Sequence, residues 1–587
     1  MRTAVKHGLL GVAVILAAAA GACASGKSSD GAALATGSGG AGAGGADSGG
    51  NGQGAGGGFN GGGCGLSGLD DLGAGVSAAD AALFAEPAGA QAPLVFDPPS
   101  GALVPDVWPS PRFLVHTSAM PALAELELVV GGETLRFTAI PEAAPKAHDD
   151  STVTGAWWTI ALPDATWEAV RCLGDEIGWS VRWAAAGAAA PAGETTGELR
   201  LLGGLAEAPD LNYLEIVQPD SVQAPSDFAV QRLALESGTP QTLATNEEQG
   251  CIGCHAVSPD GADLAYQTLE AGWRVKVMRP HDGAPPTPSP FVSPSAQALL
   301  DATSLTVPAM ARDAWSDETG HWLAAVGADG ALGLVELDAP QAKLFTAPKP
   351  GTGGTVEGEL SVATPAFAPG ADRVVFVATD GMVDGYFWQG STADLWQIPV
   401  TVTHDGAPSF GAPAPLPHVG ATAENETYPT FSRDGALLSY TRTAPGTGGY
   451  DEETAEIWVM PADGSHAPTR LVANDAPTDP VLYAGAGPTN SWSRFGNATL
   501  ERPEGTYYFL LFSSRRGDGQ LWEDRSVGSN YIAGRPIARL YLATVLLQPN
   551  GVVASFPGVL VPDQRVDAGA HTANLTAITS VPPPPAN

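Results

Sequence analysis

The sequence predicts an all-β protein with two β domains behind a glycine-rich N-terminal segment. The first observation is that apolar residues stand in short alternating segments between prolines and glycines, which favours strands over helices. The second is that, from about Leu211 onward, a turn followed by an apolar strand recurs at intervals of about 50–65 residues. A recurring unit of this length is typical of repeated β-sheets.

Residues 1–22 are predicted to be a secretory signal peptide. Arg2 and Lys6 precede a short apolar segment, 8–20, which is too short to span a bilayer stably. The following Ala20-Gly21-Ala22-Cys23 resembles the lipobox of bacterial lipoproteins, with Ala20 where that family usually has Leu. The resemblance implies cleavage before Cys23, lipidation of its thiol and a membrane anchor. Ala24 after the cysteine implies the outer membrane.

Residues 23–92 are predicted to be a disordered tether. This segment is rich in Gly, Ala and Ser and poor in large apolar side chains. It cannot bury enough apolar surface to offset the entropy of ordering it. The remaining residues are ample for two domains.

Residues 93–204 are predicted to form a β-sandwich. The region contains short alternating strands such as Leu126–Val130 and Trp179–Trp183, separated by Pro and Gly. Its opening, Phe96-Asp97-Pro98-Pro99-Ser100-Gly101, resembles the start of bacterial Ig-like modules. The resemblance implies a spacer, and no polar cluster in the region argues for another role.

Residues 205–587 contain two recurring signatures. The first is a polar turn before an apolar strand, as in Ser258-Pro259-Asp260-Gly261 and Ser432-Arg433-Asp434-Gly435. The second is an aromatic-bearing strand, as in Leu395–Pro399, which in several copies is followed by Asp-Gly or Asn-Gly. Two hairpins per repeat make a four-stranded sheet, and such sheets in a ring make a β-propeller.

The first signature resembles the PD40 or TolB-like propeller repeat over about 370 residues, with five copies visible. A sixth blade is expected from Tyr213–Val217 together with the last strands, near Val552 to Ile578. Six blades are therefore predicted, with seven as the alternative.

Cys251-Ile252-Gly253-Cys254-His255 matches the C-x-x-C-H signature of c-type haem attachment. Two thiols at this spacing can add to the two vinyl groups of one porphyrin, and the next imidazole can ligate the iron. The motif predicts one covalent haem c with His255 as proximal ligand. Two alternatives are a disulfide within the motif and half of a zinc site, although no second ligand pair follows at finger-like spacing.

The motif directly precedes the turn at Ser258. In TolB-like repeats the strand before this turn is the innermost one, which implies that His255 lies at the mouth of the central channel. Aligning the repeats on their turns puts Asp313 level with His255 and Met310 just ahead of it. Met310 is the first candidate for the distal ligand and His571 the second. No helical cytochrome c domain surrounds the motif.

Several other residues are interpreted as structural. Met278 and Met460 are assigned to the core, and Arg515-Arg516 and the Glu424-Asn425-Glu426 loop to ordinary surface. Cys23 and the haem motif account for three of the five cysteines. The other two, Cys64 and Cys172, either form a disulfide with each other or do not pair, and the sequence leaves both alternatives open.

The composition argues against a nucleic-acid partner, because 63 acidic residues outnumber 28 basic ones and repel phosphate backbones. No G-x-S-x-G, H-E-x-x-H or Walker motif supports a hydrolase. The leading hypothesis is an electron carrier of the cell envelope with a redox partner protein. The alternatives are a non-enzymatic propeller that binds a protein or glycan, and a haem oxidoreductase acting on a small substrate.

Overall fold

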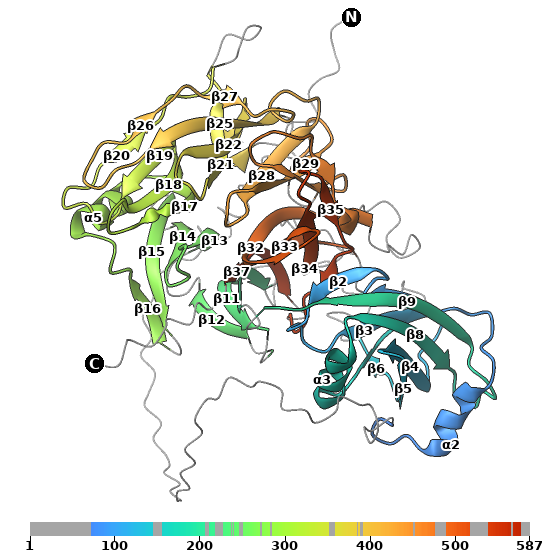
Figure 1. Ribbon diagram of the computed structural model, residues 1–587. Helices are drawn as coiled ribbons and strands as arrows, with labels where there is room; N and C mark the ends of the chain where they lie inside the picture. Colours follow the sequence, from blue (N-terminus) through green and yellow to red (C-terminus); the bar gives the residue numbers. More distant parts are fainter. Residues whose placement is uncertain are drawn as a thin grey trace, which may run out of the picture.

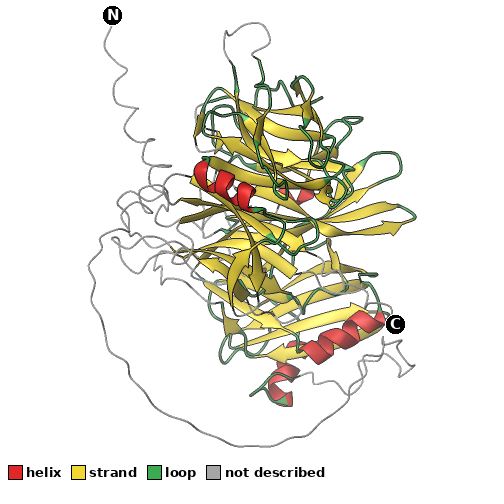
Figure 2. Cartoon of the chain, turned by 90° about the vertical axis from the view of Figure 1, so that its left-hand side faces the viewer, coloured by secondary structure: helices red, strands yellow, loops and turns green. Residues whose placement is uncertain are grey.

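The computed structural model describes residues 72–144, 155–205, 210–217, 227–235, 238, 240–245, 251–269, 273–281, 284–351, 359–383, 386–387, 391–449, 452–475, 489–516, 538–564 and 568–576. Strands dominate these residues, and the helices are few and short (Figure 2). The predicted all-β class is confirmed. The described part of the chain has no helix long and apolar enough to cross a bilayer.

Two sheets of a sandwich lie between Leu94 and Leu202. One has the order β1-β3-β7-β6 and the other β2-β9-β8-β4-β5, with β2 parallel to β9 and the remaining pairs antiparallel. The bounds are β1 Leu94–Asp97, β2 Ala102–Pro105, β3 Arg112–Thr117, β4 Leu123–Val130, β5 Glu133–Ala139, β6 Glu142–Ala143, β7 Ala156–Ala161, β8 Glu176–Ala184 and β9 Gly193–Leu202.

Alternating side chains of both sheets meet in one core. Phe113 of β3 lies edge-on to Trp179 of β8, with 5.6 Å between ring centroids, which joins the two sheets. Helix α3, Asp164–Leu173, was not anticipated from the sequence. It packs on this core through Trp167 and Val170, which its helical spacing places on one face. Short helices α2 (Ala78–Ala81) and η1 (Ala82–Ala85) precede the sandwich, where Phe84 is buried and the Gln91 carbonyl accepts from Trp183. The predicted tether, residues 23–92, is therefore wrong from Leu72 onward, because this part of the chain packs on the sandwich.

Six further sheets form a ring, as predicted (Figure 1). Each contains at least four strands, and the first strand of each sheet contacts the first strand of the next. The first blade consists of β37 (Ala568–Thr576), β10 (Asp210–Val217), β11 (Asp227–Ala234) and β12 (Pro240–Thr245), and the second of β13 (Cys251–Val257), β14 (Leu264–Leu269), β15 (Trp273–His281) and β16 (Ala284–Pro288). The third consists of β17 (Leu305–Ser316), β18 (Gly320–Gly327), β19 (Leu332–Glu336) and β20 (Leu344–Thr346), and the fourth of β21 (Ser361–Phe367), β22 (Arg373–Thr379), β25 (Ala393–Thr401), β26 (Ser409–Phe410) and β27 (Ala414–Pro415). The fifth consists of β28 (Asn425–Phe431), β29 (Leu437–Thr443), β30 (Glu456–Pro461) and β31 (Thr469–Arg470), and the last of β32 (Ser491–Arg502), β33 (Gly505–Ser514), β34 (Arg539–Leu547), β35 (Val553–Ser555) and β36 (Val559–Leu560).

Smaller elements connect these sheets. Helix α5, Pro294–Ala302, joins the second blade to the third and is capped by Ser293, whose side chain accepts a hydrogen bond from the Ala296 amide. The other connectors are the hairpin of β23 (Met382–Val383) and β24 (Tyr386–Phe387), and the turn η2 (Val472–Asp475).

The two ends of the propeller region close the ring. β37 pairs antiparallel with β10, with Leu214 opposite His571, so the last strand is the innermost strand of the first blade. This arrangement confirms the blade expected from Tyr213–Val217, with β37 as its C-terminal strand. The other described strands of the range Val552 to Ile578, β35 and β36, instead pair with β34 in the last blade, so that part of the prediction is wrong. A closed ring leaves neither terminal sheet with an exposed inner edge.

The recurring polar turn follows from its residues. In Ser432–Gly435 the serine hydroxyl donates to Asp434 Oδ1 (2.6 Å) and accepts from the Leu437 amide (2.9 Å). Gly435 then takes a φ of 77°, which glycine adopts without strain. Ser258–Gly261 repeats the pattern, with the Asp263 amide 2.8 Å from Ser258 Oγ. The turn fixes where each innermost strand ends.

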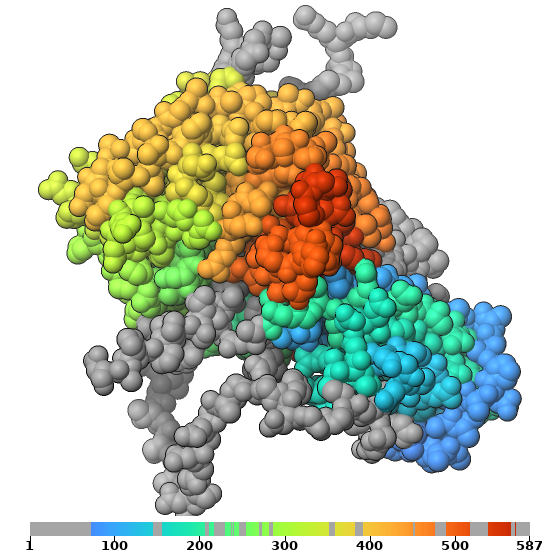
Figure 3. Space-filling model, viewed as in Figure 1, coloured from blue at the N-terminus to red at the C-terminus, as the bar shows by residue number. Residues whose placement is uncertain are grey.

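The sandwich packs directly on the last blade (Figure 3). Thr544 of β34 donates its hydroxyl to the Leu103 carbonyl of β2 (2.6 Å), and the Leu560 amide donates to Asp97 Oδ1 (2.8 Å). Apolar side chains of both bodies, including Leu103 and Leu542, belong to one continuous core. The sandwich is therefore held against the propeller through buried contacts.

Candidate functional site

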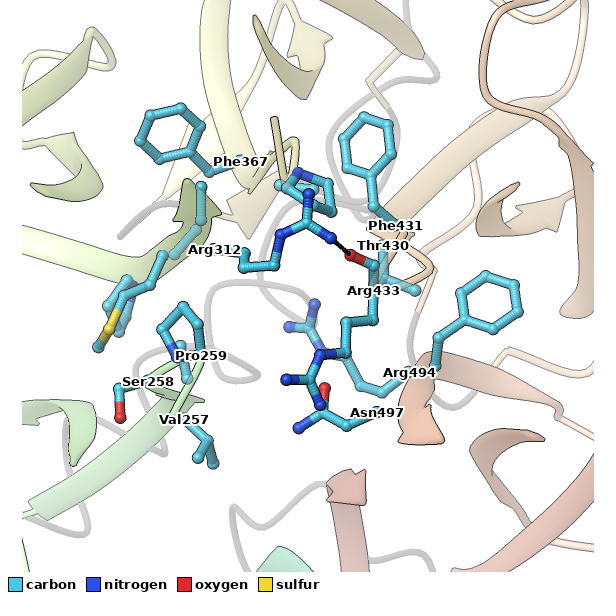
Figure 4. A pocket seen from close by; sticks show the side chains of 18 of the residues that line it. Val257, Ser258, Pro259, Arg312, Phe367, Thr430, Phe431, Arg433, Arg494 and Asn497 are labelled. Carbon is cyan, nitrogen blue, oxygen red and sulfur yellow. Dashed lines mark hydrogen bonds between the residues drawn. The ribbon is translucent and has the colours of Figure 1, made fainter. Parts of the chain in front are cut away.

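One end of the central channel opens into a cavity, here called the channel-mouth cavity. It holds about 900 Å³ of empty space, part of it open to solvent. Its wall comes from the innermost strands β13, β17, β21, β28 and β32 and the turns that follow them (Figure 4). Residues from five blades converge on it, so the cavity exists only in the closed ring. The lining residues are His255–Pro259, Pro308–Arg312, Pro365–Phe367, Pro369, Thr430–Arg433, Arg494, Phe495 and Asn497.

His255 lies on β13 in the wall of the channel-mouth cavity, on the innermost strand as the repeat implied. Its side chain is 2% exposed. The pKa of His255 is lowered to about 3, mainly by burial and also by the positive charge of Arg494, while a hydrogen bond with the Asn212 backbone partly opposes both effects. The imidazole is therefore neutral at physiological pH, which is the form that ligates a metal.

The cysteine positions of the motif lie on the same strand. Cys254 is buried, at 4% exposure. The side chain of Cys251 lies outside the described residues, but its backbone pairs with Leu269 of β14. A β-bulge lies between Ile252 and His255, so that Gly253 and Cys254 together face one residue of the partner strand. The C-x-x-C spacing thus spans a bulge rather than a helical turn.

The same bulge recurs in the innermost strand of every blade. In four blades the residue that starts it has a positive φ: Val307, Thr364, Tyr428 and Trp492. Gly253 occupies the corresponding position of β13. Such φ values strain residues with a Cβ, so these four positions carry backbone strain.

The register corrects the alignment made from the turns. Ala309, not Asp313, is the residue after the bulge in β17 and corresponds to His255. A second irregularity between Met310 and Trp315 adds residues to β17, which displaces the turn relative to the bulge. Asp313 instead pairs with its neighbour Arg312, at 2.7 Å. An alignment on turns alone could not detect these added residues.

Met310 lines the channel-mouth cavity together with His255 and is half-buried. The structure thus brings the first distal-ligand candidate and the proposed proximal ligand to one cavity on adjacent innermost strands. The backbone of His571 lies in β37, opposite Leu214, and its side chain lies outside the described residues. Met278 packs against an apolar cluster and Met460 is buried in another, as assigned.

Three arginines in the channel-mouth cavity were missed by the sequence analysis: Arg312, Arg433 and Arg494. They come from three different blades and extend into the cavity (Figure 4). The Arg312 guanidinium donates to the Arg433 carbonyl at 3.1 Å, which links two of these blades. One signal was present, since Arg433 replaces the proline of Ser258-Pro259-Asp260-Gly261 at the same place in the turn.

The assignment of Arg515 and Arg516 to the surface is wrong, because they are 4% and 2% exposed. The Arg516 guanidinium lies over the rings of Phe512 and Tyr541, 5.0 and 4.4 Å from their centroids. It donates to the Ala473 carbonyl and to Asn490 Oδ1. Stacking and hydrogen bonding compensate for desolvation of this charge, which no local sequence pattern announces.

The Glu424–Glu426 segment is also not an ordinary solvated loop. Glu426 is fully buried in β28 and accepts from Thr422 Oγ1 (2.5 Å). Burial raises the pKa of Glu426 to about 8. Arg442 lies 2.8 Å from Glu424 and 3.8 Å from Glu426. The ion pair between Arg442 of β29 and Glu424 connects the start of β28 to β29.

Another polar cluster lies on the outer side of the third blade. Glu336, His404 and Asp405 place possible metal-ligand atoms within 4.8 Å of one another. Glu336 Oε1 already accepts from the Asp405 amide (2.8 Å) and lies 2.8 Å from His404 Nδ1. These hydrogen bonds account for the cluster as a link between β19 and the turn after β25.

The remaining cysteines fall largely outside the described residues. Cys172 in α3 is disulfide-bonded. Cys23 and Cys64 both lie outside the described residues, so the lipid anchor and the pairing of Cys64 with Cys172 stay predictions.

Comparison with known proteins gives distant likenesses only. No protein-family model and no curated protein match the sequence. TolB from Acinetobacter baumannii is similar at 9% identity over 68% of this chain and 79% of that chain, with a TM-score of 0.34. A putative 6-phosphogluconolactonase from Bacteroides fragilis has 11% identity over 60% and 82%, with a TM-score of 0.30. The propeller domain of Cps50 (Swd1) from Myceliophteria thermophila has 11% over 49% and 89%, with a TM-score of 0.26. The propeller is established by its own sheets.

Proposed function

We propose that the chain is an exported lipoprotein that carries one haem c on its propeller and moves single electrons at the cell envelope. Cys251 and Cys254 would hold the group and His255 would be its proximal ligand. One observation carries the proposal: His255, directly behind two cysteine positions of the attachment spacing, lines the channel-mouth cavity as a neutral imidazole.

The chemistry of the nearby donors fits such a group. A neutral imidazole and a thioether are the two side chains that most often ligate the iron of electron-transfer cytochromes. His255 and Met310 line the same cavity from neighbouring innermost strands. Phe367, Phe431 and Phe495 add apolar wall. The bound haem would supply a one-electron couple, and the cavity wall would set its potential through burial and ligand identity.

The strand imposes one condition on attachment. Cys254 and His255 are consecutive residues of β13, and consecutive strand residues point to opposite sides of a sheet. Both side chains can reach one porphyrin only when the first residues of β13 lose their pairing with β14. The pairs Cys251–Leu269 and Ile252–Thr268, which precede the bulge, are those that must open. The bulge ends the regular pairing at this point and makes this the weakest part of the ladder.

Export supports the same proposal. Covalent haem attachment in bacteria takes place outside the cytoplasm, where the predicted signal peptide would send the chain. The predicted lipid at Cys23 and the glycine-rich sequence between Cys23 and Leu72 would tether the propeller to a membrane. A redox partner protein would then meet it at the envelope.

The test is the pyridine haemochrome spectrum of the full chain, produced with and without a c-type maturation system. We expect haem that stays with the denatured wild-type protein after maturation and is absent from the double variant Cys251→Ala/Cys254→Ala. Cys64→Ala is the matched control, because it removes a cysteine outside the motif and should keep the spectrum. A colourless wild-type protein would reject the haem and favour a propeller scaffold that binds a partner.

A further inference from the structure

The channel-mouth cavity has a charge opposite to that of the whole chain. The protein carries 63 acidic against 28 basic residues. Among the described residues, the lining of the cavity nevertheless includes Arg312, Arg433 and Arg494 and no aspartate or glutamate, although Asp313 pairs with Arg312 beside the cavity. A positively charged cavity in a protein of negative net charge focuses the electric field, so anions are attracted to the channel-mouth cavity rather than to the remaining surface.

Each arginine is held in place by a different blade. Arg312 is fixed by Asp313 (2.7 Å) and by the Arg433 carbonyl. Arg433 sits in the polar turn after β28, whose Ser432–Asp434 hydrogen bond fixes its backbone. Arg494 directly follows the bulge of β32. The three like charges are brought together by ring closure, and their mutual repulsion falls when an anion binds between them.

The positive potential reaches the wall of the cavity. The charge of Arg494 is one cause of the lowered pKa of His255, after burial. The guanidiniums lie at the solvent side, since Arg312 is exposed and Arg433 and Arg494 are half-buried, whereas His255 lies deeper and is buried. An anion can therefore reach the arginines directly from solvent.

The geometry points to a binding site for a small organic polyanion at the channel mouth, held by Arg312, Arg433 and Arg494. Guanidinium groups bind carboxylate and phosphate oxygens in bidentate geometry, so the ligand class is a small molecule with two or more such groups. The Asn497 amide and the Thr430 hydroxyl add neutral hydrogen-bonding groups to the same wall. The phenylalanines of the wall favour a ligand with a carbon skeleton over a bare inorganic ion.

The site does not depend on haem attachment. The arginines and the cysteines lie on different strands, and the cavity is complete in the polypeptide alone. Failure of the haem proposal would therefore leave this one standing, and the reverse also holds.

The experiment is calorimetric titration of the full chain, produced without a c-type maturation system, at low ionic strength. Citrate probes carboxylates with a carbon skeleton, inorganic pyrophosphate probes phosphate without one, and acetate is the single-charge control. We expect saturable citrate binding, weaker pyrophosphate binding and no measurable acetate binding. Tighter binding of pyrophosphate than of citrate would overturn the organic assignment. Absence of saturable binding of both polyanions would overturn the site.

Arginine variants distinguish binding at the channel-mouth cavity from nonspecific attraction of anions to positive charge elsewhere on the protein. Arg433→Ala and Arg494→Ala should each weaken citrate binding at least about tenfold, because each removes a charge-assisted hydrogen bond and tenfold corresponds to about 1.4 kcal/mol. Arg136→Ala removes a 60%-exposed arginine of the sandwich and should leave the affinity unchanged. Equal losses in all three variants would overturn the assignment. Cys251→Ala/Cys254→Ala should bind within about twofold of wild type, and loss of binding there would refute a site made by the arginines alone.

Discussion

His255 of β13 and Arg494 of β32 occupy the same position of their strands, directly after the recurrent bulge. Both line the channel-mouth cavity, and the charge of Arg494 lowers the pKa of the buried His255. The repeat therefore places a neutral imidazole and a guanidinium at equivalent points of one wall. One residue of this pair belongs to the proposed haem site and the other to the proposed anion site, and the charge of Arg494 affects the titration of His255.

We expect Arg494→Ala to raise the pKa of His255 from about 3, while burial still holds it below the ordinary value of 6.5. The measurement is an NMR titration of the imidazole in Cys251→Ala/Cys254→Ala protein, where no haem can attach. Arg136→Ala serves as the distant control and should leave the titration unchanged. An identical His255 pKa in the Arg494→Ala and control proteins would contradict the coupling.

His255 also predicts acid sensitivity. Its folded pKa is about 3 and its ordinary value is 6.5, so between these values the unfolded chain binds the extra proton. Stability from this group is present above about pH 6.5 and is lost as the pH falls toward 3. In haem-free Cys251→Ala/Cys254→Ala protein, His255→Gln should flatten the fall in unfolding free energy over this window, as measured by denaturant unfolding at a series of pH values. An unchanged slope would show that His255 does not titrate there.

Met310→Ala tests the distal ligand in haem-loaded protein. Loss of a thioether ligand should lower the reduction potential by on the order of 100 mV, within the about 0.8 V that axial ligands span. Spectroelectrochemical titration measures the shift. Met278→Ala is the matched control, because both methionines pack against apolar clusters and Met278 does not line the channel-mouth cavity. Equal potentials in wild type and Met310→Ala would exclude Met310 and leave His571 to be tested.

Asp97 predicts a pH dependence at the contact between sandwich and propeller. Burial raises the pKa of Asp97 to about 7, against the opposing effects of the Leu560 amide and Arg516. The folded state then binds a proton that the unfolded state releases above about pH 4. Stability from this group is therefore highest below that pH and falls as the pH rises through 7, by up to about 1.4 kcal/mol per pH unit.

Asp97→Asn keeps an oxygen that can accept from the Leu560 amide and removes the titration. We expect the variant to be more stable than wild type at pH 8 and to lose that advantage at pH 5. Urea unfolding followed by tryptophan fluorescence compares the two. Asp317→Asn changes an exposed aspartate and should show no such crossover. A stability difference that does not vary with pH would refute the titration of Asp97.

Gly435 tests the recurring turn. Its φ of 77° strains any residue with a Cβ, although space for the atom exists. A Cβ at this position would lie 3.7 Å from the nearest atom, Pro369 Cδ. Gly435→Ala should therefore cost about 1 kcal/mol through backbone strain alone. Gly351→Ala is the control, because a Cβ there meets nothing within 4 Å and its φ lies outside the left-handed region. Thermal unfolding measures both, and equal melting temperatures would contradict the argument.

Short sequence patterns were sufficient to predict the all-β class and the six-bladed propeller. The turn at Ser258–Gly261 and its copies predicted the ends of the innermost strands, because a serine hydroxyl, an aspartate and a glycine specify that turn by themselves. Tyr213–Val217 was correctly assigned to the blade completed by the last strands. Helix α3 was missed, since ten residues of amphipathic pattern between strands carry a weak signal.

The sequence by itself determined the strands, their turns, the six-bladed ring and the attachment spacing at Cys251–His255, because each depends on residues close together in the chain. Only the tertiary structure decided the channel-mouth cavity, the burial of His255 and Arg516, and the meeting of Arg312, Arg433 and Arg494. These features join residues from different blades across the closed ring. Long-range packing sets burial and charge proximity, and neither is encoded in any short run of residues.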